Sequence, residues 1–376
     1  MTHTDRKVRT WGRPLLYTSY TQDMALLDTW AKKLWCGGLI LFGLALSQVL
    51  VDHTLELLAT AFVAAIGAIG LNIVTGYAGQ VSLGHAFFLA IGAYTAAALS
   101  GDPAGRTLGF GVTNLLVWLP AAGLVAALAG VLVAPLATRL RGLYLAIVTL
   151  GLVFLGEHIF KEWDDLTGGP GVGRPAAVPD LFGWRLDQPG PLGSPEQQLY
   201  LLVLVLLVLF AIGARNLARS RIGRGFAAIR DRDIAAEVMG VPLTRYKVLA
   251  FGVSSFYAGC AGALLYSVSG GYFEAGSFSL LLSVQYIAMV LIGGVATVSG
   301  SIAGALFITL LSPVTRELPA LLPFISADTT QTPNVFQVET VLYGLLIIVF
   351  LVFEPRGLYG LWLRVRTYWK SWPFSY

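Results

Sequence analysis

The stretch that decides the fold is Asn72–Leu99, NIVTGYAGQVSLGHAFFLAIGAYTAAAL. It is apolar enough to lie inside a membrane, but Gly76, Gly79, Ser82 and Gly84 interrupt it. Glycine frees the backbone from helical dihedral angles, and non-helical backbone persists at membrane depth only where protein or a water-filled cavity covers it. A helix interrupted in this way is typical of a translocation path. Because small residues also allow helices to pack closely, a helix-packing face is the alternative.

Two residues of this stretch bear on its second half. Ser82 is expected to cap a helix that starts near Leu83, because its hydroxyl can accept from the N–H of Gly84 or His85. Polar side chains inside a membrane are costly and often functional, so a role in substrate contact or gating is weighed against simple packing. The predicted path or gate residues are Asn72, Gly76, Gly79, Gln80, Ser82, Gly84, His85 and, from a later span, Gln285.

The composition excludes a soluble protein. Hydrophobic residues make up 56% of the chain and charged residues 12%, with a mean hydropathy of +0.72. Uncharged runs recur, each close to the length of about 20 residues that a helix needs to cross a bilayer. The sequence therefore predicts an all-α polytopic membrane protein with about ten transmembrane helices, at residues 34–51, 55–75, 83–100, 113–136, 143–160, 199–214, 248–268, 280–297, 301–315 and 336–353.

The distribution of charge predicts the orientation. With the N-terminus inside and ten alternating spans, twenty of the 25 Lys and Arg residues fall in cytoplasmic segments. Basic residues accumulate on the cytoplasmic side of membrane proteins, so this asymmetry favours an even number of spans and places both termini in the cytoplasm.

The spans divide evenly, five before residue 190 and five after it. An odd number of spans in each half means that, if the halves are repeats, their topology is inverted. The local echo between them is weak: Gly76-x-x-Gly79-x-x-Ser82 compares with Gly270-Gly271 and Gly276-x-x-Ser279. A 5+5 inverted repeat is therefore a prediction of the span count more than of the motif.

Five segments follow from this topology. Residues 1–33 form a cytoplasmic tail, 34–353 the transmembrane domain, and 354–376 a second cytoplasmic tail whose basic and aromatic residues suit an anionic lipid surface. Within the transmembrane domain, 161–198 is a Gly/Pro-rich external loop, placed to meet a soluble partner. The loop 215–247 is cytoplasmic.

The cytoplasmic loop 215–247 contains a second signal. Asp233 can cap a short helix over Ile234–Met239, Gly240 suits the position after its end, and Pro242 prevents its continuation. A short amphipathic helix with small residues on its surface can dock in a groove of a partner protein. The alternative is an ordinary solvated loop, which explains the charges but not the start and stop signals.

Several kinds of chemistry leave no trace in the sequence. There is no phosphate-binding Gly-x-x-x-x-Gly-Lys-Ser/Thr loop, no His/Cys metal cluster and no Gly-x-Ser-x-Gly nucleophile elbow. We therefore expect no nucleotide, metal or catalytic site in this chain. Few acidic or basic residues lie inside the spans, which weakens the alternative of a stand-alone ion-coupled carrier.

Several blocks together resemble a known family. These are LNIVTGYAGQVSLGHAFFLAIGAYTAA (71–97), AIRDRDIAAEVMGVPLTRYKVLAF (228–251), LIGGVATVSGSIAGALF (291–307) and LVFEPRGLYGLW (351–362), with TGGPGVGRP in the external loop. They resemble the permeases of ATP-binding-cassette (ABC) importers for branched-chain amino acids, of the LivM type. The resemblance runs from about residue 65 to the C-terminus and does not include residues 1–33.

The resemblance implies a machine of several subunits in a bacterial inner membrane. It implies the ten-helix architecture of the cobalamin importers, a different second permease subunit, two cytoplasmic ATPases that carry ATP and Mg, and an extracellular or periplasmic solute-binding protein. Related permeases carry urea or short amides, which is the alternative substrate class. The residues it assigns to coupling with the ATPases are Arg230, Asp231, Asp233, Ile234, Ala235, Ala236, Glu237, Met239, Gly240 and Arg245.

Overall fold

The computed structural model describes residues 30–371 except 141, 170, 192 and 318–333. The chain divides into two compact units, Met1–Leu50 and Val51–Tyr376. The first contributes one described helix, α2 (Trp30–Val49). Most of the predicted tail 1–33 lies outside the described residues. All that follows concerns the second unit.

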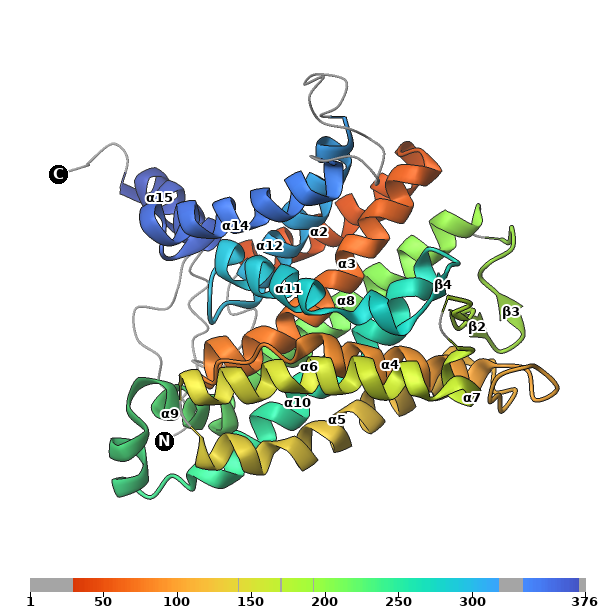
Figure 1. Ribbon diagram of the computed structural model, residues 1–376. Coiled ribbons are helices and arrows are strands. Elements are labelled where there is room, and N and C mark those ends of the chain that lie inside the picture. The colour runs from red at the N-terminus through yellow and green to blue at the C-terminus, as the bar shows by residue number, and fades with distance from the viewer. Residues whose placement is uncertain (1–29, 141, 170, 192, 318–333, 372–376) are drawn as a thin grey trace, which may run out of the picture. The chain divides into compact units, whose positions relative to one another are not determined.

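The second unit is built almost entirely of helices (Figure 1). They are α3 (Asp52–Asn72), the π-helix η1 (Ile73–Tyr77), α4 (His85–Ser100), α5 (Leu115–Arg139), α6 (Leu143–Glu162), α7 (Asp164–Thr167), α8 (Pro195–Arg219), α9 (Arg221–Val238), α10 (Leu243–Val268), the 3-10 helix η2 (Ala275–Phe278), α11 (Leu280–Gly293), α12 (Val298–Arg316), α14 (Val335–Phe353) and α15 (Gly357–Ser371).

Four two-residue strands, absent from the all-α prediction, lie in the connections. Strand β1 (Arg174–Pro175) pairs antiparallel with β4 (Tyr272–Phe273), and β2 (Asp180–Leu181) pairs antiparallel with β3 (Trp184–Arg185). The β1–β4 pair joins the predicted external loop to the segment between α10 and α11. That loop is therefore tied to the second half of the chain.

Each of the ten predicted apolar segments falls on a helix, but the number of spans is lower by length and composition. Among the described residues, seven helices are long and apolar enough to cross a membrane, and eight if the bent pair α14–α15 is one span. The shortfall arises in α4, which has 16 residues, and in the apolar part of α2, Gly37–Val49. A polytopic helical membrane protein is confirmed; ten spans, a 5+5 repeat and the cobalamin-importer architecture remain predictions.

The core forms where α10 packs against α3, α4 and α5. Gly92 of α4 meets Gly259 of α10 so closely that a β-carbon on Gly92 would lie 2.5 Å from the Gly259 Cα. Gly262 of α10 likewise faces the backbone of Leu89. Helices in membranes associate closely where small residues line the contact. Gly92 therefore serves packing, the alternative use of glycine in the opening stretch.

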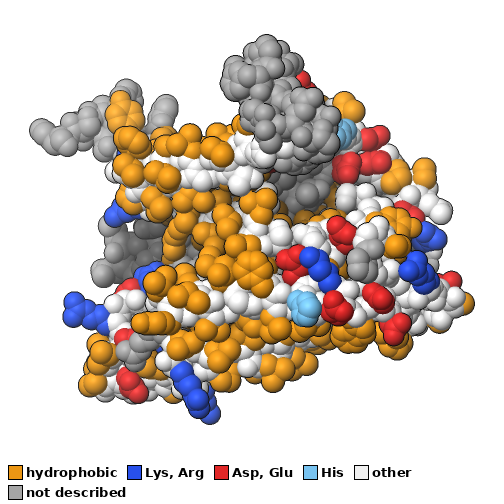
Figure 2. Space-filling view, in the orientation of Figure 1, with side chains coloured by type: hydrophobic (Ala, Val, Ile, Leu, Met, Phe, Trp, Pro, Cys, Tyr) orange, Lys and Arg blue, Asp and Glu red, His pale blue; other side chains and the backbone are white. Residues whose placement is uncertain are grey.

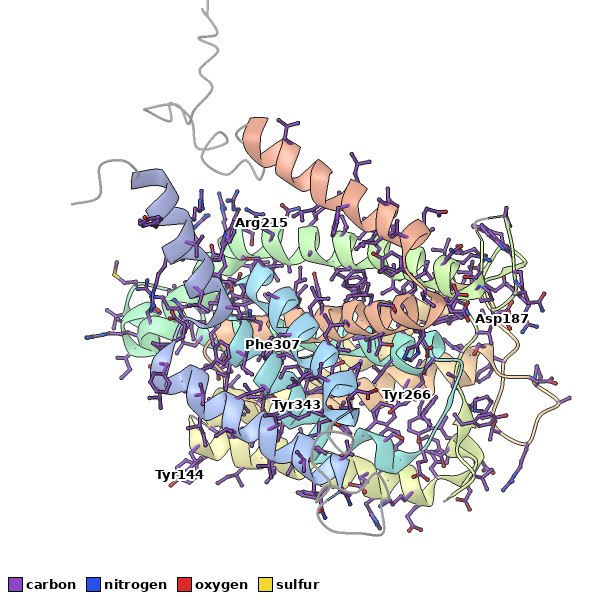
Figure 3. The ribbon with its side chains drawn as sticks, turned by 90° about the horizontal axis from the view of Figure 1, so that it is seen from above. Tyr144, Asp187, Arg215, Tyr266, Phe307 and Tyr343 are labelled. Carbon is purple, nitrogen blue, oxygen red and sulfur yellow. The ribbon has the colours of Figure 1, made fainter. Side chains whose placement is uncertain are left out.

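Polar and apolar side chains separate along this unit. Figure 2 shows hydrophobic side chains across the middle of one face and acidic and basic side chains gathered toward its ends. Figure 3 shows Arg215, near the end of α8, and Asp187, in the loop before α8, at opposite ends. Helix α8 is longer than the predicted 199–214, because Ser194 and Gln197 form a reciprocal capping box at its start.

Candidate functional site

The interruption in the opening stretch is real but shorter than predicted. Helix α3 continues through η1 to Tyr77, and regular helix resumes at His85, so the non-helical backbone covers only residues 78–84. Gly79 has a φ of +67°, a left-handed conformation that favours glycine. The glycine at this position is therefore required by the local backbone.

Ser82 is not the principal cap of α4, which corrects the prediction. The helix starts at His85, and the Ser82 hydroxyl accepts only a long 3.4 Å hydrogen bond from the Gly84 N–H. Distant side chains take the neighbouring donors: Thr149 Oγ1 accepts from the Leu83 N–H and Ser283 Oγ from the Ala86 N–H, both at 2.9 Å. These partners come from α6 and α11, where no local sequence pattern could reveal them.

Asn72 connects this segment to the turn between α11 and α12. Its side-chain N–H groups donate to the Thr297 carbonyl at 3.0 Å and to Ser301 Oγ at 2.7 Å, and its Oδ1 accepts from the Ala296 N–H at 2.8 Å. Asn72 is buried, and Ala296 has a φ of +58°, a left-handed conformation that is unfavourable for alanine. One amide therefore holds a strained turn more than 200 residues away in sequence.

The predicted coupling loop contacts the same segment. The Arg230 guanidinium donates to the Gly76 carbonyl at 3.3 Å. A β-carbon on Gly79 would lie 2.8 Å from Arg230 Cγ, so the arginine stem packs directly on that glycine. The two sequence signals, predicted separately, meet at one place in the structure.

The predicted two-turn helix at 234–239 belongs to a longer element. Helix α9 begins at Arg221, and its only non-helical residue is Arg232, with φ −158° and ψ 99°. The second part of α9, after this kink, is the predicted helix. Its end is as predicted: Gly240 has a φ of +83°, and the Val241 N–H donates back to the Ala236 carbonyl at 2.9 Å, as in a Schellman motif.

The second part of α9 presents an apolar surface. Ile234, Val238 and Met239 are 66%, 82% and 84% exposed. Ala236 is buried, so this member of the predicted coupling set faces the protein and cannot meet a partner directly. Beside the surface lies an open groove of about 970 Å³. Its lining includes Glu237, Gly240 and Arg245, while Asp231 and Ala235 are exposed nearby and Asp233 is half-buried.

At the other end of the unit, a buried arginine anchors the predicted external loop. The Arg174 side chain is only 1% exposed, and its guanidinium donates to the carbonyls of Ala97, Leu166 and Leu108. Burial lowers the pKa of Arg174 below that of a free guanidinium, although arginine stays charged in proteins. Arg174 also belongs to β1, whose partner strand β4 places Phe273 in an aromatic cluster with Tyr94, Tyr266 and Phe278.

Replacing Arg174 by methionine is expected to loosen this loop. The change leaves three carbonyls without their charged donor, and the expected cost in stability is about 3 kcal/mol. The apparent melting temperature of the purified protein should therefore fall. Arg185→Met is the matched control, because the Arg185 side chain is 54% exposed and its ion pair with Asp187 lies at the surface, worth less than about 1 kcal/mol. Equal melting temperatures for the two variants would contradict the anchoring role.

The path residues do not all come together. His85 and Tyr286 are buried side by side, with ring centroids 4.9 Å apart. Gln285, the predicted residue of this span, is half-buried, and Gln80 lies in the non-helical segment with its amide on the Ala78 carbonyl. Sequence reasoning missed Tyr286, since a tyrosine in an apolar run carries no signal of its own. Among the described residues, no group of three His, Cys, Asp or Glu side chains could hold a metal ion.

These features define a class: a multi-pass α-helical membrane protein whose interrupted helix contacts a polar loop with an exposed apolar helix. Sequence comparison then supplies the family. Residues 53–351 match the family described as "Branched-chain amino acid transport system / permease component", and the chain belongs to it. The resemblance stated from the motifs is thereby confirmed.

Individual relatives agree with this assignment. The chain is 30% identical over 347 residues to the high-affinity branched-chain amino acid transport system permease protein LivM of Escherichia coli (strain K12), covering 88% of this chain and 76% of that protein. The LivM of Salmonella typhimurium is similar to the same extent. The autoinducer 2 import system permease protein LsrC of Enterobacter sp. (strain 638) is 31% identical over 175 residues, 45% of this chain and 47% of LsrC. No solved structure matches the chain.

Proposed function

We propose that this chain is the transmembrane subunit of an ABC importer that moves branched-chain amino acids inward by alternating access, driven by ATP hydrolysis on partner subunits. The observation that supports this most is the contact of Arg230 with the Gly76 carbonyl and with Gly79. It joins an exposed helix, suited to docking, with the interrupted segment of the predicted path. A movement imposed on α9 from outside is therefore passed directly to that segment.

The partner ATPases are expected to bind the surface formed by Ile234, Val238 and Met239. Exposed apolar side chains of this size on a charged loop fit the apolar centre of an interface, with Asp231, Glu237 and Arg245 at its rim. A partner shifts a conformational equilibrium only if it binds the two states with different affinity. ATP-bound and ATP-free ATPases, which would hold α9 differently, meet that condition.

The remaining partners follow from the family. We expect a second permease subunit, two ATPases that bind ATP and Mg, and a solute-binding protein that meets the loop 161–198. The location is a bacterial inner membrane with both termini in the cytoplasm, in line with the basic residues around α9. Branched-chain amino acids are the favoured substrate because both LivM relatives span most of the chain; urea or a short amide is the alternative.

Changing Val238 to glutamate should break the docking surface without unfolding the protein. Val238 is 82% exposed, so a charge is tolerated in the free chain, but in an interface it would be desolvated. Co-purification of the ATPase from native membranes should fall at least about tenfold, a loss of about 1.4 kcal/mol. Val172→Glu, at an exposed valine in the loop 161–198, is the control. Undiminished recovery of the ATPase with Val238→Glu would remove the docking assignment.

The proposed function is tested by reconstituting the co-purified complex in proteoliposomes. Uptake of radiolabelled leucine, isoleucine and valine should require enclosed ATP and the binding protein. Uptake by the purified chain alone, driven by an ion gradient, would show a stand-alone carrier instead. Uptake of urea or acetamide in preference to leucine would replace the substrate but leave the class of transporter intact.

A further inference from the structure

A pair of buried polar groups lies where α3, α4 and α11 meet. His85 begins α4 and is 2% exposed, and Tyr286 on α11 is 1% exposed. The imidazole hydrogen-bonds the backbone of Gly67, which leaves Nε2 as the ring nitrogen without a partner. The Tyr286 hydroxyl also has no partner. The neighbouring Ser283 hydroxyl, by contrast, is occupied by the Ala86 N–H.

The fold makes room for this tyrosine at a cost. A β-carbon on Gly67 would lie 2.5 Å from Tyr286 Cε1, so the glycine in α3 forms the notch that accepts the phenol ring. A buried polar group without a hydrogen bond is unfavourable, because its contacts with water are lost and not replaced. Phenylalanine would fill the same notch without that cost. Two such groups side by side therefore suggest a ligand that is absent in this closed arrangement.

The chemistry of the pair specifies the ligand. With its other nitrogen bonded to Gly67, the imidazole offers Nε2 as an acceptor, while a phenol hydroxyl can donate. A ligand that carries one donor and one acceptor close together would satisfy both. An α-amino acid in its zwitterionic form has this arrangement, with its ammonium directed to His85 and its carboxylate to Tyr286.

The position of the pair links it to the moving parts. His85 directly follows the non-helical residues 78–84, whose Gly79 packs on Arg230. A displacement of α9 is therefore carried to the start of α4, and it would open or close the space between His85 and Tyr286. We propose that His85 Nε2 and the Tyr286 hydroxyl form the transient contact for the zwitterionic head group of the substrate during its passage. This inference rests on the proposed function and adds the residues that touch the substrate.

Tyr286→Phe tests the inference in the complete complex, reconstituted with ATPases and binding protein. Its control is Ser255→Ala, which removes another buried hydroxyl without a partner, from Ser255 of α10 packed against Gly130 of α5. Leucine uptake at saturating binding protein and leucine should fall about tenfold or more in Tyr286→Phe, as expected for losing a hydrogen bond to a charged group. Stimulated ATP hydrolysis should persist, so fewer leucine molecules are transported for each ATP. His85→Asn should show the same lower ratio.

The thermal stability of the two variants separates this role from a structural one. If the Tyr286 hydroxyl awaits substrate, its removal leaves the apparent melting temperature unchanged or higher, as in Ser255→Ala, while uptake falls only in Tyr286→Phe. Uptake in Tyr286→Phe at the rate of Ser255→Ala would overturn the inference. So would a lower melting temperature, which would show that the hydroxyl supports the fold. Failure of ATP-dependent uptake in the unmodified complex would instead refute the proposed function itself.

Discussion

Replacing Gly76 by alanine is expected to abolish uptake. A β-carbon at this position would overlap Asn72 Oδ1 outright and lie 2.6 Å from the Ala296 nitrogen, so the methyl group would occupy the site of their hydrogen bond. Overpacking costs about 1–3 kcal/mol, and an unmade buried hydrogen bond costs about as much again. The strained Ala296 turn would lose its support, and the Gly76 carbonyl would shift away from Arg230. Uptake and the apparent melting temperature should both fall.

The control for this substitution is Gly151→Ala in α6. Gly151 is exposed within a helix, and a β-carbon there meets no atom within 4 Å. Alanine is favoured over glycine in a helix by about 1 kcal/mol, so this variant should be at least as stable as the parent and transport normally. If Gly76→Ala behaved like Gly151→Ala, the hydrogen bonds of Asn72 would have no part in the mechanism.

Replacing Gly240 by proline should uncouple transport while leaving the chain in the membrane. Gly240 has a φ of +83° and donates its N–H to the Glu237 carbonyl at 2.9 Å. Proline fixes φ near −65° and has no N–H, so the turn from α9 into α10 cannot form. The surface of Ile234, Val238 and Met239 would lose its fixed orientation. We expect the ATPase activity of the complex to stop responding to the binding protein.

Gly240→Asn separates the backbone requirement from other effects of substitution. Asparagine tolerates the left-handed conformation better than other residues with a side chain, and nothing lies within 4 Å of a β-carbon here. Uptake should therefore be close to that of the parent protein. Normal uptake in Gly240→Pro, measured beside this variant, would exclude the turn from the coupling mechanism.

The sequence predicted features that depend on neighbouring residues. The apolar segments, the interruption near Gly79 and the turn at Gly240 all arise from local hydrophobicity or from dihedral angles that glycine favours. The start of α9 was missed because Gly223 and Gly225 suggest a loop. In the structure, Gly223 packs against the end of α8 and Gly225 against the ring of Tyr246, so tertiary contacts select glycine within a helix.

The parts that could not be predicted depend on residues distant in sequence. The caps from Thr149 and Ser283, the hydrogen bonds of Asn72 and the pairing of β1 with β4 join segments from different parts of the chain. Asn72 itself was predicted as a path residue, whereas its amide is fully engaged in hydrogen bonds within the protein. Tyr286 was not predicted, because only the packing of α11 on α3 shows that it faces His85.

The hydrogen bonds of Asn72 also restrict where this molecule can bend. They fasten the end of α3 to the first turn of α12 through three buried contacts, so these two segments are expected to travel as one rigid body. A hinge placed between them would have to break all three at once. The flexing that opens the protein to either side is then left to surfaces without such bonds, above all the glycine-lined contact of α4 with α10.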